Sequence, residues 1–203
     1  MTEPTLKVYP SPHDIKMEKM GFRRFDVIAD AHRKSPHEIK VSLHNNEIIL
    51  GDFYDLKNTL KYKLHQAEDE YENIKKIYGE RYLPGNHERD PYKNTFYEDG
   101  NVLFHHGHRI FWSKEKVEKD AKKPRGCGYM RWIGLSIIAP FRRMRLIQIG
   151  VRKKHLERVY QLAKKHKCDT VVCGHAHPRK IIDKTYKGIR LVVVPRGRSV
   201  IYV

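Results

Sequence analysis

Short apolar runs, each followed by polar residues, recur along the chain and predict a set of buried strands. They lie at 25–29, 48–50, 81–83, 102–104 and 171–173 and are rich in Val, Ile, Leu and Phe. The run at 171–173 is continuously apolar, as is typical of strands buried in parallel sheets. Two further apolar segments, 190–194 and 199–203, flank Pro195-Arg196-Gly197-Arg198, and we expect them to form a terminal hairpin.

Two segments have helical periodicity. Between Asp55 and Gly79, apolar residues recur at steps of three and four, from Leu56 to Ile77. This spacing predicts an amphipathic helix that Asp55 caps and Gly79 ends. A second helix is expected around 151–166. Residues 1–24 contain three prolines and little periodicity, so we expect an irregular leader with room for one edge strand.

The polar residues that follow the apolar runs have the chemistry of metal ligands. They include two carboxylates, one amide and several imidazoles, and no thiolate. Loops at the carboxyl ends of strands converge on one crevice in α/β sheets. Mixed oxygen and nitrogen donors suit Mn, Fe or Zn, and their number suits two ions, which a carboxylate such as Asp52 can bridge. Two adjacent ions stabilise in-line displacement at phosphorus, so these residues predict phosphoester hydrolysis.

The same residues form five ordered blocks: Asp30-x-His32, Gly51-Asp52-x-x-Asp55, Gly85-Asn86-His87-Glu88, His106-Gly107-His108 and Gly174-His175-x-His177. Together they resemble the motifs of the calcineurin-like metallophosphoesterase superfamily, over roughly residues 25–108 and 168–203. The resemblance implies an α/β fold, a four-layer α/β/β/α sandwich. It also implies a phosphodiesterase or phosphatase with two divalent ions, Mn²⁺ being the first choice and Fe, Zn, Ni or Mg the alternatives.

The resemblance also implies a role for each matching residue. The matching metal ligands are Asp30, His32 and His177 for one ion, Asn86, His106 and His175 for the other, and Asp52 as the bridge. His87 matches a histidine that contacts the phosphate and assists the leaving group, so His87 and Asp52 are the expected catalytic residues. Asp55 is either a helix cap or a contact to the site. Whether His105 and His108 touch the site stays open, and we expect the other histidines, including His155 and His166, on the surface.

The net charge of +17 is concentrated in one segment. Between Arg109 and Lys167 there are 18 Lys or Arg residues and four acidic ones, a net +14. This asymmetry indicates an anionic partner, either nucleic acid, a phospholipid surface or a phosphorylated substrate. We therefore expect a single domain over 1–203 in which 109–167 is a basic helical insertion or cap.

Substrate contacts are expected near the centre of this segment and after its last strand. The candidates are Arg131, Trp132, Arg142, Arg143 and Arg196. For the stretch 129–151, three interpretations stay open. It is a packed helical insertion with a solvated basic side, a cap lying on a membrane surface, or a nucleic-acid groove in which Trp132, Tyr129 or Trp112 stacks on bases.

The position of the insertion is similar to that of the helical lid in UDP-2,3-diacylglucosamine pyrophosphatases, which implies a lipid-pyrophosphate hydrolase as an alternative. Those enzymes, however, have an arginine where this chain has His87. An alternative of another class is a non-catalytic nucleic-acid-binding module built on the same fold.

The cysteines and the apolar runs give information about the cellular compartment of the protein. Cys127, Cys168 and Cys173 are odd in number and form no Cys-x-x-Cys pair, which favours a reducing compartment. No run of 18 apolar residues is present, and the first residues lack the layout of a secretory signal. We expect a cytoplasmic protein, with peripheral contact to the inner face of a membrane as an alternative.

Overall fold

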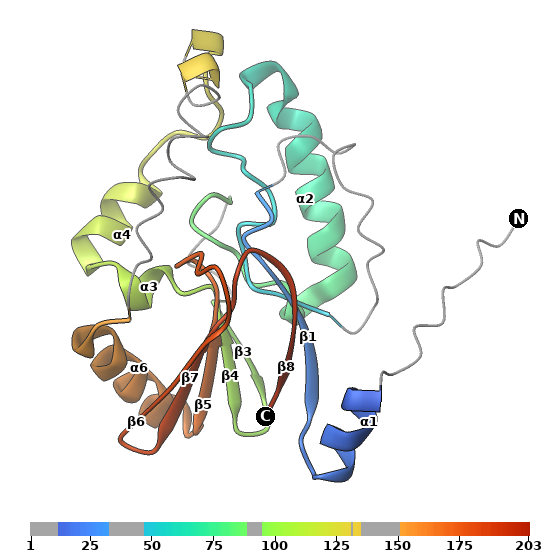
Figure 1. The fold of residues 1–203 in the computed structure, drawn as a ribbon. Coiled ribbons are helices and arrows are strands. Elements are labelled where there is room, and N and C mark those ends of the chain that lie inside the picture. Colours follow the sequence, from blue (N-terminus) through green and yellow to red (C-terminus); the bar gives the residue numbers. More distant parts are fainter. Residues whose placement is uncertain (1–11, 33–46, 89–94, 131, 135–150) are drawn as a thin grey trace, which may run out of the picture.

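Two mixed β-sheets form the centre of the fold in the residues that the computed structural model describes, 12–32, 47–88, 95–130, 132–134 and 151–203 (Figure 1). The smaller sheet has the order β2-β1-β8, with β1 at Arg24–Ala29, β2 at Ile48–Ile49 and β8 at Gly197–Tyr202. Strand β1 is parallel to β2 and antiparallel to β8.

The larger sheet has five strands in the order β3-β4-β5-β7-β6. They are β3 (Phe96–Asp99), β4 (Val102–His105), β5 (Thr170–Cys173), β6 (Ile182–Tyr186) and β7 (Ile189–Val193). The three central strands are parallel and both edge strands are antiparallel to their neighbours. The expectation of parallel strands therefore applies to the middle of this sheet.

Alternation of side chains along the strands builds apolar layers on both faces of each sheet. In β4, Val102 and Phe104 pack against the smaller sheet, whereas Leu103 packs on the opposite face. Helix α2 (Leu64–Tyr78) covers the outer face of the smaller sheet through Ala67 and Tyr71. Helices α3 (His108–Phe111) and α6 (Lys153–His166) cover the outer face of the larger sheet. The period-two pattern of the strands thus positions a helical layer on each side.

Several shorter elements also lie in the described part of the chain. They are α1 (Pro12–Lys19), α4 (Lys114–Ala121) and two 3₁₀ turns, η2 (Lys61–Lys63) and η3 (Gly79–Arg81). No helix in the described ranges combines the length and the apolar character needed to cross a membrane. All three cysteines are free and buried.

The predicted strands at 25–29, 48–50, 102–104 and 171–173 and the helix near 151–166 are confirmed, with small shifts at their ends. The terminal hairpin is wrong. Strand β7 pairs with β5 and β6, whereas β8 crosses to the other sheet and pairs with β1. The hairpin partner of β7 is β6, whose outward-facing polar residues gave it no apolar pattern.

Two other predictions at helices are corrected. Helix α2 begins at Leu64, because Asp55 contacts Asn58 and His87, residues 56–58 form a turn, and Leu60 forms a bridge with Cys127. The leader contains α1, which begins at a proline, as first helical turns allow, and which an Asp14–Arg24 ion pair of 3.1 Å ties to β1.

Two smaller expectations also fail. Residues 81–83 form an isolated bridge between Ile49 and Tyr82 in place of a strand. His155 is buried, because its Nδ1 accepts a hydrogen bond from the backbone N–H of Arg152 at the start of α6.

Substitutions at two isoleucines can test which surfaces of the fold are buried. Ile49 has no exposed surface, whereas Ile77 on α2 is 64% exposed although it continues the apolar spacing of the helix. We expect Ile49→Ala to lower the free energy of unfolding by about 2–5 kcal/mol because it leaves a cavity. Ile77→Ala should change it by less than about 0.5 kcal/mol. Urea denaturation of both variants measures the difference, and equal losses would contradict this packing.

Candidate metal centre

Five loops, each following a strand or extended segment, meet at one edge of the two sheets and bring the seven expected ligands together. Potential ligand atoms of Asp30, Asp52, His106 and His175 all lie within 4.8 Å of one another, as do those of Asp30, His32 and His177. Asp30 and His32 follow β1, Asp52 follows β2, and the other loops follow Leu83, β4 and β5. The loops after these strands therefore bring residues into contact that are 145 positions apart in the sequence, such as His175 and Asp30.

The first group of donors is centred on His106. Its Nε2 lies 3.1 Å from Nδ1 of His175, 3.2 Å from Oδ1 of Asn86 and 3.4 Å from Oδ2 of Asp52. The Nδ1–H of His106 donates to the carbonyl oxygen of Leu50 at 2.6 Å. Because that bond keeps a proton on Nδ1, Nε2, which faces the other donors, is the nitrogen that can bind a cation once its own proton has left. This is the arrangement of a metal-ligating histidine.

The second group is centred on His177. Its Nε2 lies 2.9 Å from Oδ1 of Asp30 and 3.4 Å from Nε2 of His32. Nε2 of His32 is 4.0 Å from Asp30 and also 4.0 Å from Oδ2 of Asp52. Asp52 Oδ2 therefore lies between the two groups, which is the position that a bridging carboxylate needs.

Backbone N–H groups fix both carboxylates. The N–H of His175 donates to Oδ2 of Asp30 at 2.7 Å, and the N–H of His87 donates to Oδ1 of Asp52 at 2.7 Å. Each carboxylate thus has one oxygen held by the backbone and its second oxygen directed at the ring nitrogens. Both aspartates are at most 1% exposed.

Strained backbone accompanies the donors. Asp30, His32, Asp52, His175 and His177 all have positive φ, between 46° and 65°. Among the described residues, Lys167 and Lys187 are the other non-glycine residues with this conformation. Left-handed backbone costs about 1–2 kcal/mol for each such residue and is concentrated at functional sites.

The buried carboxylates and the imidazoles of the centre shift one another's pKa values. Burial would raise the pKa of Asp52, but the positive charges of His106 and His87 hold it well below its ordinary value. Burial likewise opposes ionisation of Asp30, and the hydrogen bond from His177 and the charge of His106 lower its pKa. Against the effect of burial, the nearby carboxylates raise the pKa of His106 to about 9. Two buried carboxylates ringed by imidazoles fit divalent cations in charge and in donor type.

His87 stands at the edge of the centre, where one of its ring nitrogens lies within 4.8 Å of donor atoms of His32 and Asp52, and it has a further partner. Its Nδ1–H donates to Oδ1 of Asp55 at 2.6 Å, and its ring lies 4.8 Å from the ring of His32. Burial lowers its pKa, but the charge of Asp52 and the hydrogen bond to Asp55 outweigh burial and raise it. Of the two roles expected for Asp55, the structure shows the contact to the site.

Two supporting groups were not predicted. Glu88 is fully buried and accepts hydrogen bonds from the N–H groups of Phe53 (2.8 Å), Tyr54 (3.1 Å) and Gly85 (2.7 Å) and from the hydroxyl of Tyr82. It thereby joins the loop after β2 to the loop that carries Asn86. Burial and the charge of Asp52 raise the pKa of Glu88 to about 7.

The second supporting group comes from the basic segment. Oδ2 of Asp120, on α4, lies 3.5 Å from Nδ2 of Asn86 and pairs with the buried amine of Lys57. This contact turns the amide oxygen of Asn86 toward His106. Asp120 is one of only four acids in the basic segment, which was the one available signal in the sequence.

The remaining expected residues lie around the centre. His105 stacks on Phe96 and His108 lies 5.3 Å from the ring of His106, and neither joins a donor group among the described residues. Nε of Arg196 donates to the backbone oxygen of Asp30 at 3.0 Å. Trp132 stacks with Tyr129 at 6.2 Å. Arg131, Arg142 and Arg143 lie outside the described residues.

No family model matches the chain, and no curated protein matches it either. Any assignment of function therefore rests on the centre itself.

Gly85 lies against the expected ligand Asp52 and therefore allows the geometry of the centre to be tested. A methyl group at Gly85 would overlap the backbone nitrogen and Oδ1 of Asp52, whereas a methyl group at Gly128 would meet no atom within 4 Å. We expect Gly85→Ala to weaken Mn²⁺ binding by about 10–100-fold, the usual effect of disturbing the support of a metal ligand. Gly128→Ala should bind as the unmodified protein does. Calorimetric titration with Mn²⁺ measures both, and unchanged affinity in Gly85→Ala would contradict the site.

Proposed function

We propose that this protein is a two-metal-dependent phosphoester hydrolase with the four-layer α/β/β/α fold of the calcineurin-like metallophosphoesterases. The observation that carries the proposal is the convergence of seven oxygen and nitrogen donors from five loops on one buried centre. The fold supports it, because two sheets pack face to face and helices cover the outer face of each.

In this proposal, each group of donors holds one divalent cation. Asp30, His32 and His177 would hold the first, Asn86, His106 and His175 would hold the second, and Asp52 would contribute to both. When bound, two such cations neutralise charge on the phosphoryl oxygens and make water a better nucleophile. Mn²⁺ is the cation we expect, because the donor set is mixed and contains no thiolate.

His87 supplies the proton. Asp55 orients its ring through Nδ1, and the same contact raises the pKa of His87 and so favours the protonated imidazole. The second ring nitrogen can then donate to the oxygen of the leaving group. A non-catalytic binding module needs no protonated histidine held beside the donors, so this contact favours hydrolysis over that alternative.

Replacing the shared carboxylate tests the two-metal proposal. Asp52→Asn removes the charge that both donor groups use, so we expect the loss of bound Mn²⁺ and a fall of at least about 100-fold in hydrolysis of bis(p-nitrophenyl) phosphate. Asp183→Asn is the matched control, since Asp183 lies on edge strand β6 and pairs with Arg190 at 2.7 Å. Elemental analysis and turnover decide the matter, and near-normal activity of Asp52→Asn would exclude a shared carboxylate.

Replacing His87 separates proton donation from metal binding. His87→Ala should retain its metal content and lose about 10²–10⁴-fold in rate, the usual contribution of acid–base assistance. The loss should be smallest for p-nitrophenolate, a leaving group that needs no proton. The fully exposed His65 provides the matched control, His65→Ala. If His87→Ala loses metal as readily as His175→Ala, His87 is a ligand and the proposed role is wrong.

A further inference from the structure

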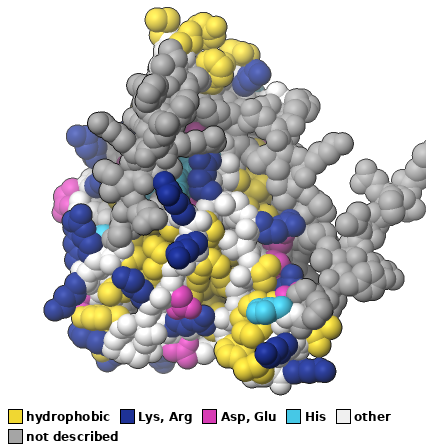
Figure 2. Space-filling model, in the orientation of Figure 1, with side chains coloured by type: hydrophobic (Ala, Val, Ile, Leu, Met, Phe, Trp, Pro, Cys, Tyr) yellow, Lys and Arg dark blue, Asp and Glu magenta, His cyan; other side chains and the backbone are white. Residues whose placement is uncertain are grey.

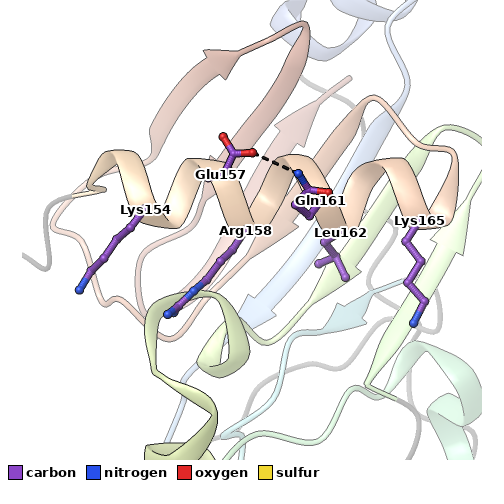
Figure 3. A pocket seen from close by; sticks show the side chains of 6 residues that line it. All are labelled: Lys154, Glu157, Arg158, Gln161, Leu162 and Lys165. Carbon is purple, nitrogen blue, oxygen red and sulfur yellow. Dashed lines mark hydrogen bonds between the residues drawn. The ribbon is translucent and has the colours of Figure 1, made fainter.

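Two adjoining grooves lie on the surface that α3, α4 and α6 form in the described part of the chain. The first, of about 540 Å³, is lined by Arg109, Trp112, Lys114, Val117, Glu118 and Arg158. The second, of about 490 Å³, is lined by Lys154, Glu157, Arg158, Gln161, Leu162 and Lys165 (Figure 3). Arg158 lines both grooves, so they adjoin at this residue, and we call the pair the α4–α6 groove.

The α4–α6 groove is positively charged. Five of its lining residues are Lys or Arg, and two are acidic. Both acids have cationic partners, since Glu118 lies 3.9 Å from Lys114, and Glu157 accepts hydrogen bonds from Lys187 at 3.1 Å and from the hydroxyl of Tyr186. Figure 2 shows Lys and Arg side chains spread over the side of the molecule where α4 and α6 lie. The excess positive charge indicates an anionic ligand.

The cations are arranged in a line. Lys154, Arg158 and Lys165 point to one side of α6, whereas Glu157 lies on the other (Figure 3). At 1.5 Å per residue, the first and last of these residues are about 16 Å apart along the helix axis. Such a length suits an extended polyanion better than a single nucleotide.

Hydrogen bonds hold the side chain of Arg158 in place where the two parts of the α4–α6 groove adjoin. Its Nη1 donates to the carbonyl oxygens of Ile110 at 2.9 Å and Trp112 at 2.6 Å. Bonds to neutral carbonyls fix the guanidinium and leave its charge intact. An arginine fixed in this way is suited to a phosphate group.

Trp112 connects the groove to the metal centre. Its ring lies 4.5 Å from the ring of His175, and Nζ of Lys116 lies 4.1 Å over the same tryptophan ring. Trp112, which lines the groove, therefore lies beside a histidine of the candidate centre. An unpaired base that stacks on Trp112 would take the place of the Lys116 amine.

We propose that the α4–α6 groove binds single-stranded nucleic acid, with the scissile phosphodiester at the metal centre and the neighbouring phosphates on Arg158, Lys154 and Lys165. This inference rests on the proposed hydrolytic function and names its substrate class. A lipid surface fits less well, because Val117 is buried and Leu162 is half-buried, and cationic helices bind membranes through an exposed apolar face.

Tryptophan fluorescence tests the proposal without turnover. The chain has two tryptophans, so Trp132→Phe leaves Trp112 as the sole emitter. With metals removed by EDTA, titration with oligothymidylate at low salt should produce a saturable change in Trp112 emission. Anionic phosphatidylglycerol vesicles should produce none. No response to the oligonucleotide, or a response to vesicles alone, would overturn the proposal.

Salt dependence tests the contribution of the groove. In the Trp132→Phe protein, adding Lys154→Met with Lys165→Met should reduce the slope of log affinity against log salt by about 1.4, which is about 0.7 for each phosphate contact on a single strand. The matched control adds Lys16→Met with Lys76→Met, which removes two exposed lysines on α1 and α2. Equal slopes in the two double variants would show that binding occurs elsewhere and would refute the groove.

Each of the two proposals can be refuted independently of the other. Asp52→Asn in the Trp132→Phe protein should still bind oligothymidylate in EDTA, because the groove needs no metal. If bis(p-nitrophenyl) phosphate is hydrolysed and the oligonucleotide does not bind, the inference about the groove is wrong and the hydrolase proposal stands. If the oligonucleotide binds and Asp52→Asn retains normal hydrolysis, the two-metal proposal is wrong and the groove stands.

Discussion

The structure depends on two hydrogen bonds between backbone N–H groups and buried carboxylates. His175 N–H to Asp30 joins a loop of the smaller sheet to a loop of the larger one, and His87 N–H to Asp52 joins the loops after β2 and Leu83. Hydrogen bonds to charged groups contribute about 1.5–3 kcal/mol each, and an ionised carboxylate without such partners is not tolerated in the interior. The same bonds leave one oxygen of each aspartate directed at the imidazoles, so the contacts that hold the loops together also create the candidate metal centre.

This arrangement is strained, and the apolar core between the sheets supports it. Five donor residues have left-handed backbone, and Gly85 lies so close to Asp52 that no side chain fits there. The residues just before these loops, such as Ala29, Leu50 and Leu83, are fully buried in the cluster between the sheets. Donors carried directly after rigid strand ends are held more accurately than donors on long loops. Glu88 adds to this support by accepting hydrogen bonds from two of the loops.

Described residues of the basic segment contact the centre. Asp120 contacts the amide of Asn86, and Trp112 contacts the ring of His175. Part of the segment also belongs to the core, because Val159 and Ala163 of α6 pack on the larger sheet. The positive charges lie on the outer side of the same helices (Figure 2).

The sequence by itself determined what depends on neighbouring residues. Apolar runs predicted four of the strands, and the polar residues after these strands included six of the seven donors, because a residue that follows a strand must lie at the edge of a sheet. The seventh, Asn86, follows the run at 81–83, which forms only an isolated bridge. The sequence did not determine which distant segments meet. The pairing of β8 with β1, the contact of Asp55 with His87, and the contacts of Asp120 and Glu88 join residues from different loops, and no local pattern encodes such partners. The start of α2 was misplaced for the same reason, since a tertiary contact holds Asp55 in a turn. Only the packing of the two sheets, by which these loops were brought to one edge, decided those contacts.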